Sequence, residues 1–161
     1  MYGSLAEAET YHANRNRSEW AAADPQEQTA ALEMASTYLD SLYEPRYVGE
    51  RAGGVEQSLG WPRVGQRVTA LGLSDETVPL LIQSASYELA YYELTNPGSL
   101  FRVFDPTTAV KRETVGPITT EYALPNSESP ASAFQVKIGF VEGMIEPLLK
   151  SSIKIPVAFV V

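Results

Sequence analysis

The stretch from Asp24 to Pro45 constrains the fold most, because it carries the signals that begin and end a long amphipathic helix. Asp24 is a good N-cap, Pro25 suits the first helical position, and Glu27 completes a capping box. Hydrophobic side chains recur between these signals at helical spacing: Ala31, Met34, Ala35, Tyr38, Leu39 and Leu42. Three polar side chains lie off that stripe: Gln28, Glu33 and Asp40. The pattern predicts an amphipathic helix of about five turns.

Further helices are indicated before and after this one. Ser4 and Glu7 form a Ser-x-x-Glu capping box that predicts a first helix, and Trp20 follows it in a short link. Ser74 or Asp75 is predicted to cap another helix, which stops at Asn96. Residues 140–149 suggest a last helix, although it contains a glycine and a proline.

Two segments depart from the helical pattern. Residues 44–73 are rich in glycine and read as a loop of about thirty residues, a length that is unusual in a compact domain and often functional. Trp61, Pro62 and Arg63 lie in the middle of this loop and are candidate interface residues. Residues 110–115 and 118–122 predict a β-hairpin around a Gly-Pro pair. The hairpin's candidate contact residues are Val115, Gly116, Pro117 and Tyr122, with Val110 and Ile118 as further candidate buried positions.

Residues 153–161 are strongly apolar. As a strand they would place one row of side chains on one face: Ile153, Ile155, Val157, Phe159 and Val161. An exposed strand of this kind is an aggregation template, so we expect it to pair with its own sheet, a neighbouring subunit or another protein. The two intermolecular options are favoured, because only one short hairpin is predicted within the chain. The fold class predicted is mainly α: a small helical bundle with a long Gly-rich loop, a β-hairpin insertion and an extended C-terminal arm. The expected organisation is a helical domain over residues 1–150, with the hairpin near 109–123, followed by the arm over 151–161.

The chain of 161 residues is acidic, with a formal net charge of −8. Constitutive nucleic-acid binders and proteins of anionic membrane surfaces rely on Lys and Arg, so neither class is the default interpretation. Residues 1–50 hold nine acidic and three basic side chains, a net of −6. The sequence shows no signal peptide and no apolar run of about 18 residues. We therefore expect a soluble protein made in the cytoplasm, with no membrane partner.

Catalytic signals are sparse. The chain has one histidine, His12, and no cysteine, which excludes Cys nucleophiles, thiolate metal sites and a histidine cluster within one chain. A lone histidine on a helix is more often structural, and the acidic pairs show no EF-hand spacing. We therefore expect no enzyme activity, no cofactor and no metal.

One pattern favours nucleic acid. Arginines and aromatic residues alternate around the loop and could stack on single-stranded DNA: Arg46, Arg51, Arg63, Arg67, Tyr43, Tyr47 and Trp61. The favoured interpretation is that Trp61 anchors the loop to the core while Arg63 pairs with an acid. Three tyrosines of the later helix could also stack on bases, but packing in the core or at a subunit interface is the favoured interpretation. They are Tyr87, Tyr91 and Tyr92.

Several blocks together resemble a known family over roughly residues 2–149. They are Tyr2-Gly3-Ser4-Leu5-Ala6-Glu7-Ala8, Ala35-Ser36-Thr37-Tyr38-Leu39-Asp40, Leu59-Gly60-Trp61-Pro62-Arg63, Val78-Pro79, the segment 110–122 and Pro147-Leu148-Leu149. This set is similar to the tailed-phage proteins labelled DnaT-like single-stranded DNA-binding proteins, which resemble head–tail connector adaptors, also called head-completion proteins. The apolar segment 153–161 is not part of the resemblance.

The resemblance implies a ring of subunits, usually twelvefold, beneath the phage portal protein. Such a ring extends the DNA channel and contacts the next neck or tail connector protein, so genome DNA passes through it without specific binding. The leading hypothesis is thus a structural subunit of the virion's head–tail joint, with acids such as Glu7, Glu9, Glu33 or Asp40 repelling DNA. The alternative is a single-stranded DNA-binding accessory protein of replication. A small regulatory or toxin-related domain has no positive feature in the sequence.

Overall fold

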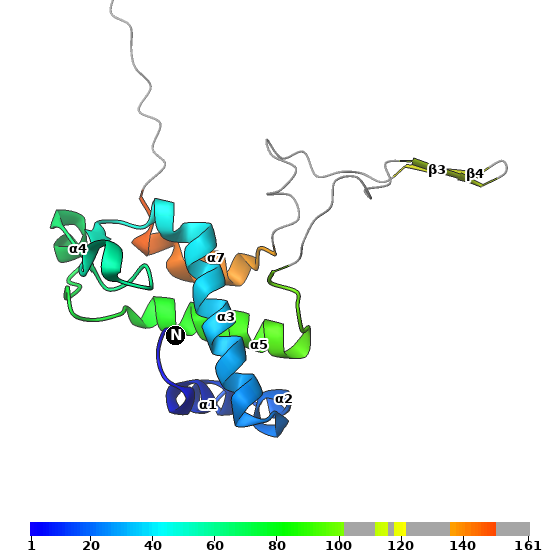
Figure 1. Cartoon of the computed structure of the whole chain (residues 1–161), viewed down its shortest axis with the longest axis horizontal. Helices are drawn as coiled ribbons and strands as arrows, with labels where there is room; N and C mark the ends of the chain where they lie inside the picture. Colours follow the sequence, from blue (N-terminus) through cyan, green and yellow to red (C-terminus); the bar gives the residue numbers. More distant parts are fainter. Residues whose placement is uncertain (102–111, 116–117, 122–135, 151–161) are drawn as a thin grey trace, which may run out of the picture.

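The computed structural model describes residues 1–101, 112–115, 118–121 and 136–150 (Figure 1). The fold is mainly helical, which confirms the predicted class. The α-helices are α1 (Leu5–Ala13), α2 (Ser18–Ala22), α3 (Pro25–Tyr43), α4 (Gln66–Ala70), α5 (Leu80–Thr95) and α7 (Gly139–Ile145). Single 3-10 turns are η1 (Glu44–Arg46), η2 (Gly54–Glu56) and η3 (Glu146–Leu148), and the strands are β1 (Glu50–Arg51), β2 (Arg63–Val64), β3 (Arg112–Val115) and β4 (Ile118–Glu121).

Helices α3 and α5 cross at the centre of the molecule, and no other pair of described elements packs together as extensively (Figure 1). Helices α1 and α2 pack around the N-terminal half of α3, whereas α4 and η3 lie near its C-terminal end. Helix α7 packs on α5. Packing against neighbouring elements is the main source of stability for helices of this length.

The capping signals of the first two predicted helices are confirmed. The Ser4 hydroxyl accepts from the Glu7 amide while the Glu7 carboxylate accepts from the Ser4 amide. Asp24 and Glu27 form the same reciprocal pair at the start of α3, with Pro25 at the first helical position. These bonds satisfy amides that have no partner within the helix, so both helices begin where the sequence predicts.

The predicted start of α5 is wrong. The helix begins at Leu80, with Pro79 as an extended N-cap, and Ser74 instead accepts a hydrogen bond from the Glu76 amide in a local turn. Proline disfavours the helical conformation in the residue before it, so residues up to Val78 do not join the helix. The predicted C-terminal stop at Asn96 is confirmed.

The prediction of an irregular loop over residues 44–73 is wrong in part. Strands β1 and β2 pair antiparallel, with Glu50 opposite Val64 and Arg51 opposite Arg63. Helix α4 follows directly. The buried side chains of Trp61 and Val68 hold this region against the core. The sequence pattern misses these elements because each is only a few residues long.

Two other predictions near helices need correction. Trp20 lies in α2 rather than in a link, and its ring is buried. Gln28, predicted to lie off the buried stripe of α3, is buried and donates its side-chain amide to the Trp20 carbonyl oxygen at 2.6 Å. The last helix ends at Ile145 and continues as η3, because Pro147 cannot donate the amide that a longer helix needs.

The predicted β-hairpin is confirmed over its described residues. Strands β3 and β4 pair antiparallel, with Arg112 opposite Glu121 and Val115 opposite Ile118. The other predicted hairpin residues, Val110, Gly116, Pro117 and Tyr122, lie outside the described residues, as does the predicted arm over 151–161. Within the described ranges, no helix is both long and apolar enough to cross a membrane.

Candidate functional site

The Trp61-Pro62-Arg63 segment is held inside the fold at the C-terminal end of α3. Arg63 is only 6% exposed, and its guanidinium donates to three carbonyl oxygens: those of Val48 at 2.8 Å, Gly60 at 3.0 Å and Gly49 at 2.7 Å. Burial lowers the pKa of Arg63 from its usual value. Because these bonds consume most of its donors, Arg63 ties the two sides of the loop together rather than presenting charge to a ligand.

The Trp61 ring is 2% exposed and packs at an angle against Tyr47, with ring centroids 5.6 Å apart. Pro62 is half-buried. The nearest acid to Arg63 is Glu44, at 3.9 Å. The interpretation of Trp61 as an anchor of the loop to the core is therefore confirmed. Arg63 does lie near an acid, as predicted, but this ion pair is the longest among the described residues.

A buried network connects this loop to the N-terminus and to α3. The Tyr2 hydroxyl donates to Asp40 Oδ1 at 2.6 Å and accepts from the Trp61 amide at 3.1 Å. Asp40 Oδ2 accepts from the Gly60 amide at 2.8 Å, and the Tyr2 amide donates to Ser36 Oγ at 2.8 Å. Burial raises the pKa of Asp40. This network joins three segments that are distant in sequence.

The predicted role of Asp40 on a DNA-repelling surface is therefore wrong. Its side chain is buried, and a Cβ atom at position 60 would stand 2.8 Å from Asp40 Oδ1, so the glycine allows the close approach. By contrast, Glu7, Glu9 and Glu33 are exposed, as predicted. Sequence reasoning missed Tyr2 and Asp40 as partners because no local spacing connects residues 38 positions apart.

The proposed stacking platform is largely internal. Tyr43, Tyr47 and Trp61 are buried. Arg51 forms a two-pronged ion pair with Glu44, with Nη2 to Oε2 at 2.7 Å. Of the platform's arginines, only Arg46 and Arg67 are exposed. The described residues therefore do not form one exposed surface of aromatic rings and arginines on this loop.

A second aromatic cluster surrounds His12 at the other end of the molecule. The ring of His12 is buried against Trp20, with centroids 4.2 Å apart, and its Nδ1 lies 3.3 Å from Arg17. Burial, helped by the nearby Arg17 charge, lowers the pKa of His12 to about 4. Glu88 accepts from the Tyr11 hydroxyl at 2.8 Å and pairs with Arg17 at 2.6 Å. His12 is thus a neutral, buried ring at neutral pH.

The tyrosines of α5 divide between core and surface. Tyr87 is buried, whereas Tyr91 is half-buried beneath the Arg17 guanidinium, 4.2 Å from its ring centroid. The Tyr91 hydroxyl donates to Glu19 at 3.1 Å. Tyr92 is half-buried and packs against the core. The favoured reading of these tyrosines as packing residues agrees with their burial.

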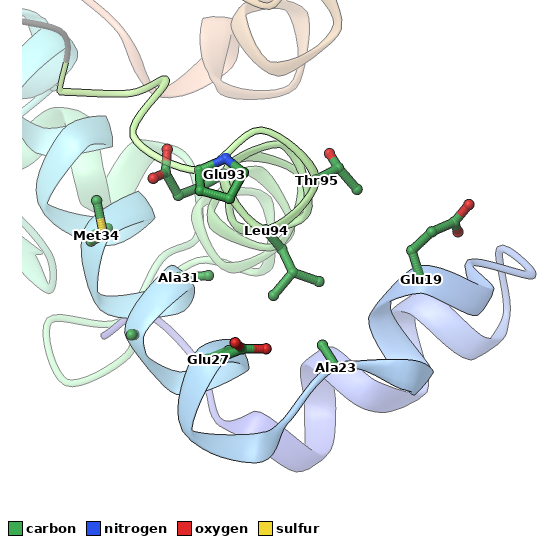
Figure 2. A pocket seen from close by; sticks show the side chains of 10 residues that line it. Glu19, Ala23, Glu27, Ala31, Met34, Glu93, Leu94 and Thr95 are labelled. Atoms are coloured by element: carbon green, nitrogen blue, oxygen red, sulfur yellow. The ribbon is translucent and has the colours of Figure 1, made fainter.

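An open groove lies between α2, the N-terminal half of α3 and the end of α5 (Figure 2). Its volume is about 650 Å³, within the range of typical ligand pockets. Figure 2 shows Leu94 pointing from α5 toward Ala31, Ala23 and Glu27, while Glu19 lies on α2. The remaining lining residues are Ala30, Met34, Glu93, Thr95 and Pro97. The groove has an apolar floor with carboxylates around it.

The three carboxylates of the groove differ in their partners. Glu93 is buried and accepts from the amides of Gly98 and Leu100, so it stabilises the turn after α5. Glu19 and Glu27 are exposed, and neither forms an ion pair within the described part of the chain. The described lining residues include no Lys or Arg. This opening therefore favours a ligand that is apolar and positively charged.

The described residues contain no group of three or more His, Asp or Glu side chains that could hold a metal ion. What they define is a small helical protein in which the Trp-Pro-Arg segment is internal and an apolar, acidic groove is open. The chain belongs to the family described as "Putative DnaT-like ssDNA binding protein", whose model matches residues 1–159. Comparisons with curated proteins and with solved structures found no match.

Proposed function

We propose that this protein is a non-enzymatic structural subunit that acts by assembling with other protein chains. The observation that carries this proposal is the contrast between Trp61 and Arg63, which are buried, and the apolar surfaces that remain open. Leu80 is 76% exposed and Phe140 is 61% exposed, in addition to the groove floor. Open apolar surfaces rimmed by polar residues are typical of protein–protein contact sites.

The assembly that best fits the sequence is a ring at the head–tail joint of a tailed phage virion, twelvefold as in the connector adaptors that the chain resembles. In this proposal the ring joins the portal protein to the next neck or tail protein and extends the DNA channel. The net charge of −8 supports it, because a conduit through which DNA slides must not hold phosphate. The exposed Glu7, Glu9 and Glu33 would supply that repulsion.

The C-terminal segment has a role in this proposal as well. Residues 151–161 contact a neighbouring subunit or the portal, and the row from Ile153 to Val161 supplies the apolar side chains. Deleting residues 151–161 and mixing the product with purified portal protein tests this step. We expect binding to fall at least tenfold, and unchanged binding would remove the segment from the proposal.

The competing function is single-stranded DNA binding, which the description of the family names. A salt-dependent titration against a labelled oligonucleotide separates the two functions. Replacing Trp61 or Arg63 would disturb the fold, so Arg46→Ala and Arg67→Ala are the better probes. Micromolar or tighter binding at physiological salt, lost in these variants, would favour the DNA-binding function over the assembly function.

A further inference from the structure

The groove beside α3 combines an apolar floor with a negatively charged rim. Its floor is apolar, formed by alanines, Met34 and Leu94, and its rim carries the exposed carboxylates of Glu19 and Glu27. Neither carboxylate has a basic partner among the described residues. A segment that is apolar and carries a positive charge would satisfy both properties.

The chain itself contains a segment with that chemistry. Residues 151–161, Ser-Ser-Ile-Lys-Ile-Pro-Val-Ala-Phe-Val-Val, include seven hydrophobic side chains and no acid, and Lys154 is their only basic residue. A lysine within an apolar stretch matches a groove whose apolar floor has carboxylates at its edge. The lysine complements the negative charge of the rim, and the apolar side chains complement the apolar floor.

The point at which this segment leaves the described fold decides which copy it can reach. The Lys150 amide donates to the Arg46 carbonyl oxygen at 2.6 Å, just beyond the C-terminal end of α3. Glu27 lies near the other end of this helix, and the sixteen steps from Glu27 to Tyr43 span about 24 Å at a helical rise of 1.5 Å. Four residues of fully extended chain cover at most about 14 Å. The backbone of Lys154 therefore falls short of Glu27 in its own subunit, and a charge contact within one subunit would need the chain and both side chains to be fully extended.

We propose that the groove binds residues 151–161 of a second copy of this chain, with Lys154 beside Glu19 and Glu27 and apolar side chains against Leu94 and Met34. The segment and the groove belong to opposite ends of α3, so the contact is head-to-tail. A head-to-tail contact that repeats with a closing rotation generates a ring. The inference rests on the proposed assembly function and identifies the surface through which copies join.

A charge exchange between full-length chains tests this contact. Lys154→Glu places a negative charge in the segment, and Glu19→Lys with Glu27→Lys makes the groove positive. Each variant alone has one mismatched pair, and we expect its self-association to weaken at least tenfold in sedimentation velocity. Mixing the two variants makes both possible pairs complementary again, so association should return in the mixture. Misfolding of either variant would not produce this recovery.

A matched control changes the same charge elsewhere. Glu50→Lys with Glu56→Lys alters two exposed acids near β1 and η2, outside the groove. This control should associate as the unmodified chain does. Equal weakening in the control, or no recovery in the mixture, would overturn the proposed contact, because either result would assign the effect to net charge rather than to the groove.

A peptide measurement separates this inference from the proposed function. A labelled peptide of residues 149–161, acetylated and amidated so that its two lysines carry its only charges, is titrated against the full-length chain. We expect binding that weakens at least tenfold with the Lys154→Glu peptide or with the groove variant. Absence of binding to a chain that still assembles would overturn the groove contact alone. Groove-dependent binding to a chain that stays monomeric, with and without portal, would support the contact and contradict the ring function.

Discussion

The two ends of α3 carry different residue types and expose them to different extents. At the C-terminal end, the nearby aromatic rings are buried, and Arg63 donates its hydrogen bonds to the backbone of its own loop. At the N-terminal end, apolar side chains and carboxylates line an open groove. A set of residues typical of nucleic-acid binding can thus be buried by folding, while a groove of alanines, leucine and carboxylates stays open to a partner.

The largest expected effect on stability concerns Trp61, at the C-terminal end of α3. Trp61→Ala should reduce the free energy of unfolding by about 4 kcal/mol, the usual cost of removing a fully buried large aromatic side chain. Leu80→Ala, at a position that is 76% exposed, should change it by less than about 0.5 kcal/mol. Urea unfolding followed by circular dichroism measures both. Similar small effects for the two variants would mean that Trp61 is not an anchor.

The second prediction concerns His12, which is buried near the N-terminal end of α3. The pKa of His12 is about 4 in the folded chain against 6.5 for an exposed histidine, so the unfolded chain binds more protons between these values. The stability that neutral His12 supports is complete above pH 6.5 and declines as the pH falls toward 4, by about 3 kcal/mol at 1.36 kcal/mol per pH unit.

The measurement for His12 is unfolding in urea at several pH values. His12→Gln removes the titrating group, so its stability should depend less on pH in this window than that of the unmodified chain. Asp40, whose pKa is raised by burial, acts in the opposite direction and is present in both chains, so the difference between them isolates His12. Parallel curves would contradict the burial of a neutral His12.

The third prediction concerns the hydrogen-bond network that joins Tyr2 to Asp40 and to the loop that contains Trp61. Tyr2→Phe removes the hydroxyl that donates to Asp40 and accepts from the Trp61 amide. Removing one partner so that a buried polar group is left unsatisfied costs about 2 kcal/mol, so we expect a loss of that size. The outcome to look for is faster amide exchange at Gly60 and Trp61 in particular. Unchanged amide exchange at Gly60 and Trp61 would mean that the Tyr2 hydroxyl does not stabilise the loop.

The smallest effect is expected at the exposed arginines. Arg46→Ala with Arg67→Ala should change stability by less than about 0.5 kcal/mol, since both side chains face solvent. We expect no change in oligonucleotide affinity, because the neighbouring aromatic rings are buried. Fluorescence anisotropy at two salt concentrations measures it. If the unmodified chain shows salt-dependent binding and this variant loses it, the hypothesis of a DNA-binding surface on the loop would be supported again.

Sequence reasoning succeeded where the determining interactions are local. The Ser4 and Asp24 capping boxes act over three residues, so both helix starts could be predicted from spacing. It failed where a distant segment decides burial. Asp40 lies off the apolar stripe of α3, yet Tyr2 and Gly60 supply the partners that let it be buried. The groove was missed for the same reason, because α2, α3 and α5 form it only when packed together.

One measurement tests most directly whether this protein acts by assembly or by binding DNA. The full-length chain is sedimented with an equimolar labelled single-stranded oligonucleotide at physiological salt, and protein and label are followed at separate wavelengths. We expect a fast, ring-sized protein boundary without label, and free oligonucleotide sedimenting slowly behind it. A monomeric protein boundary that carries the label would contradict it.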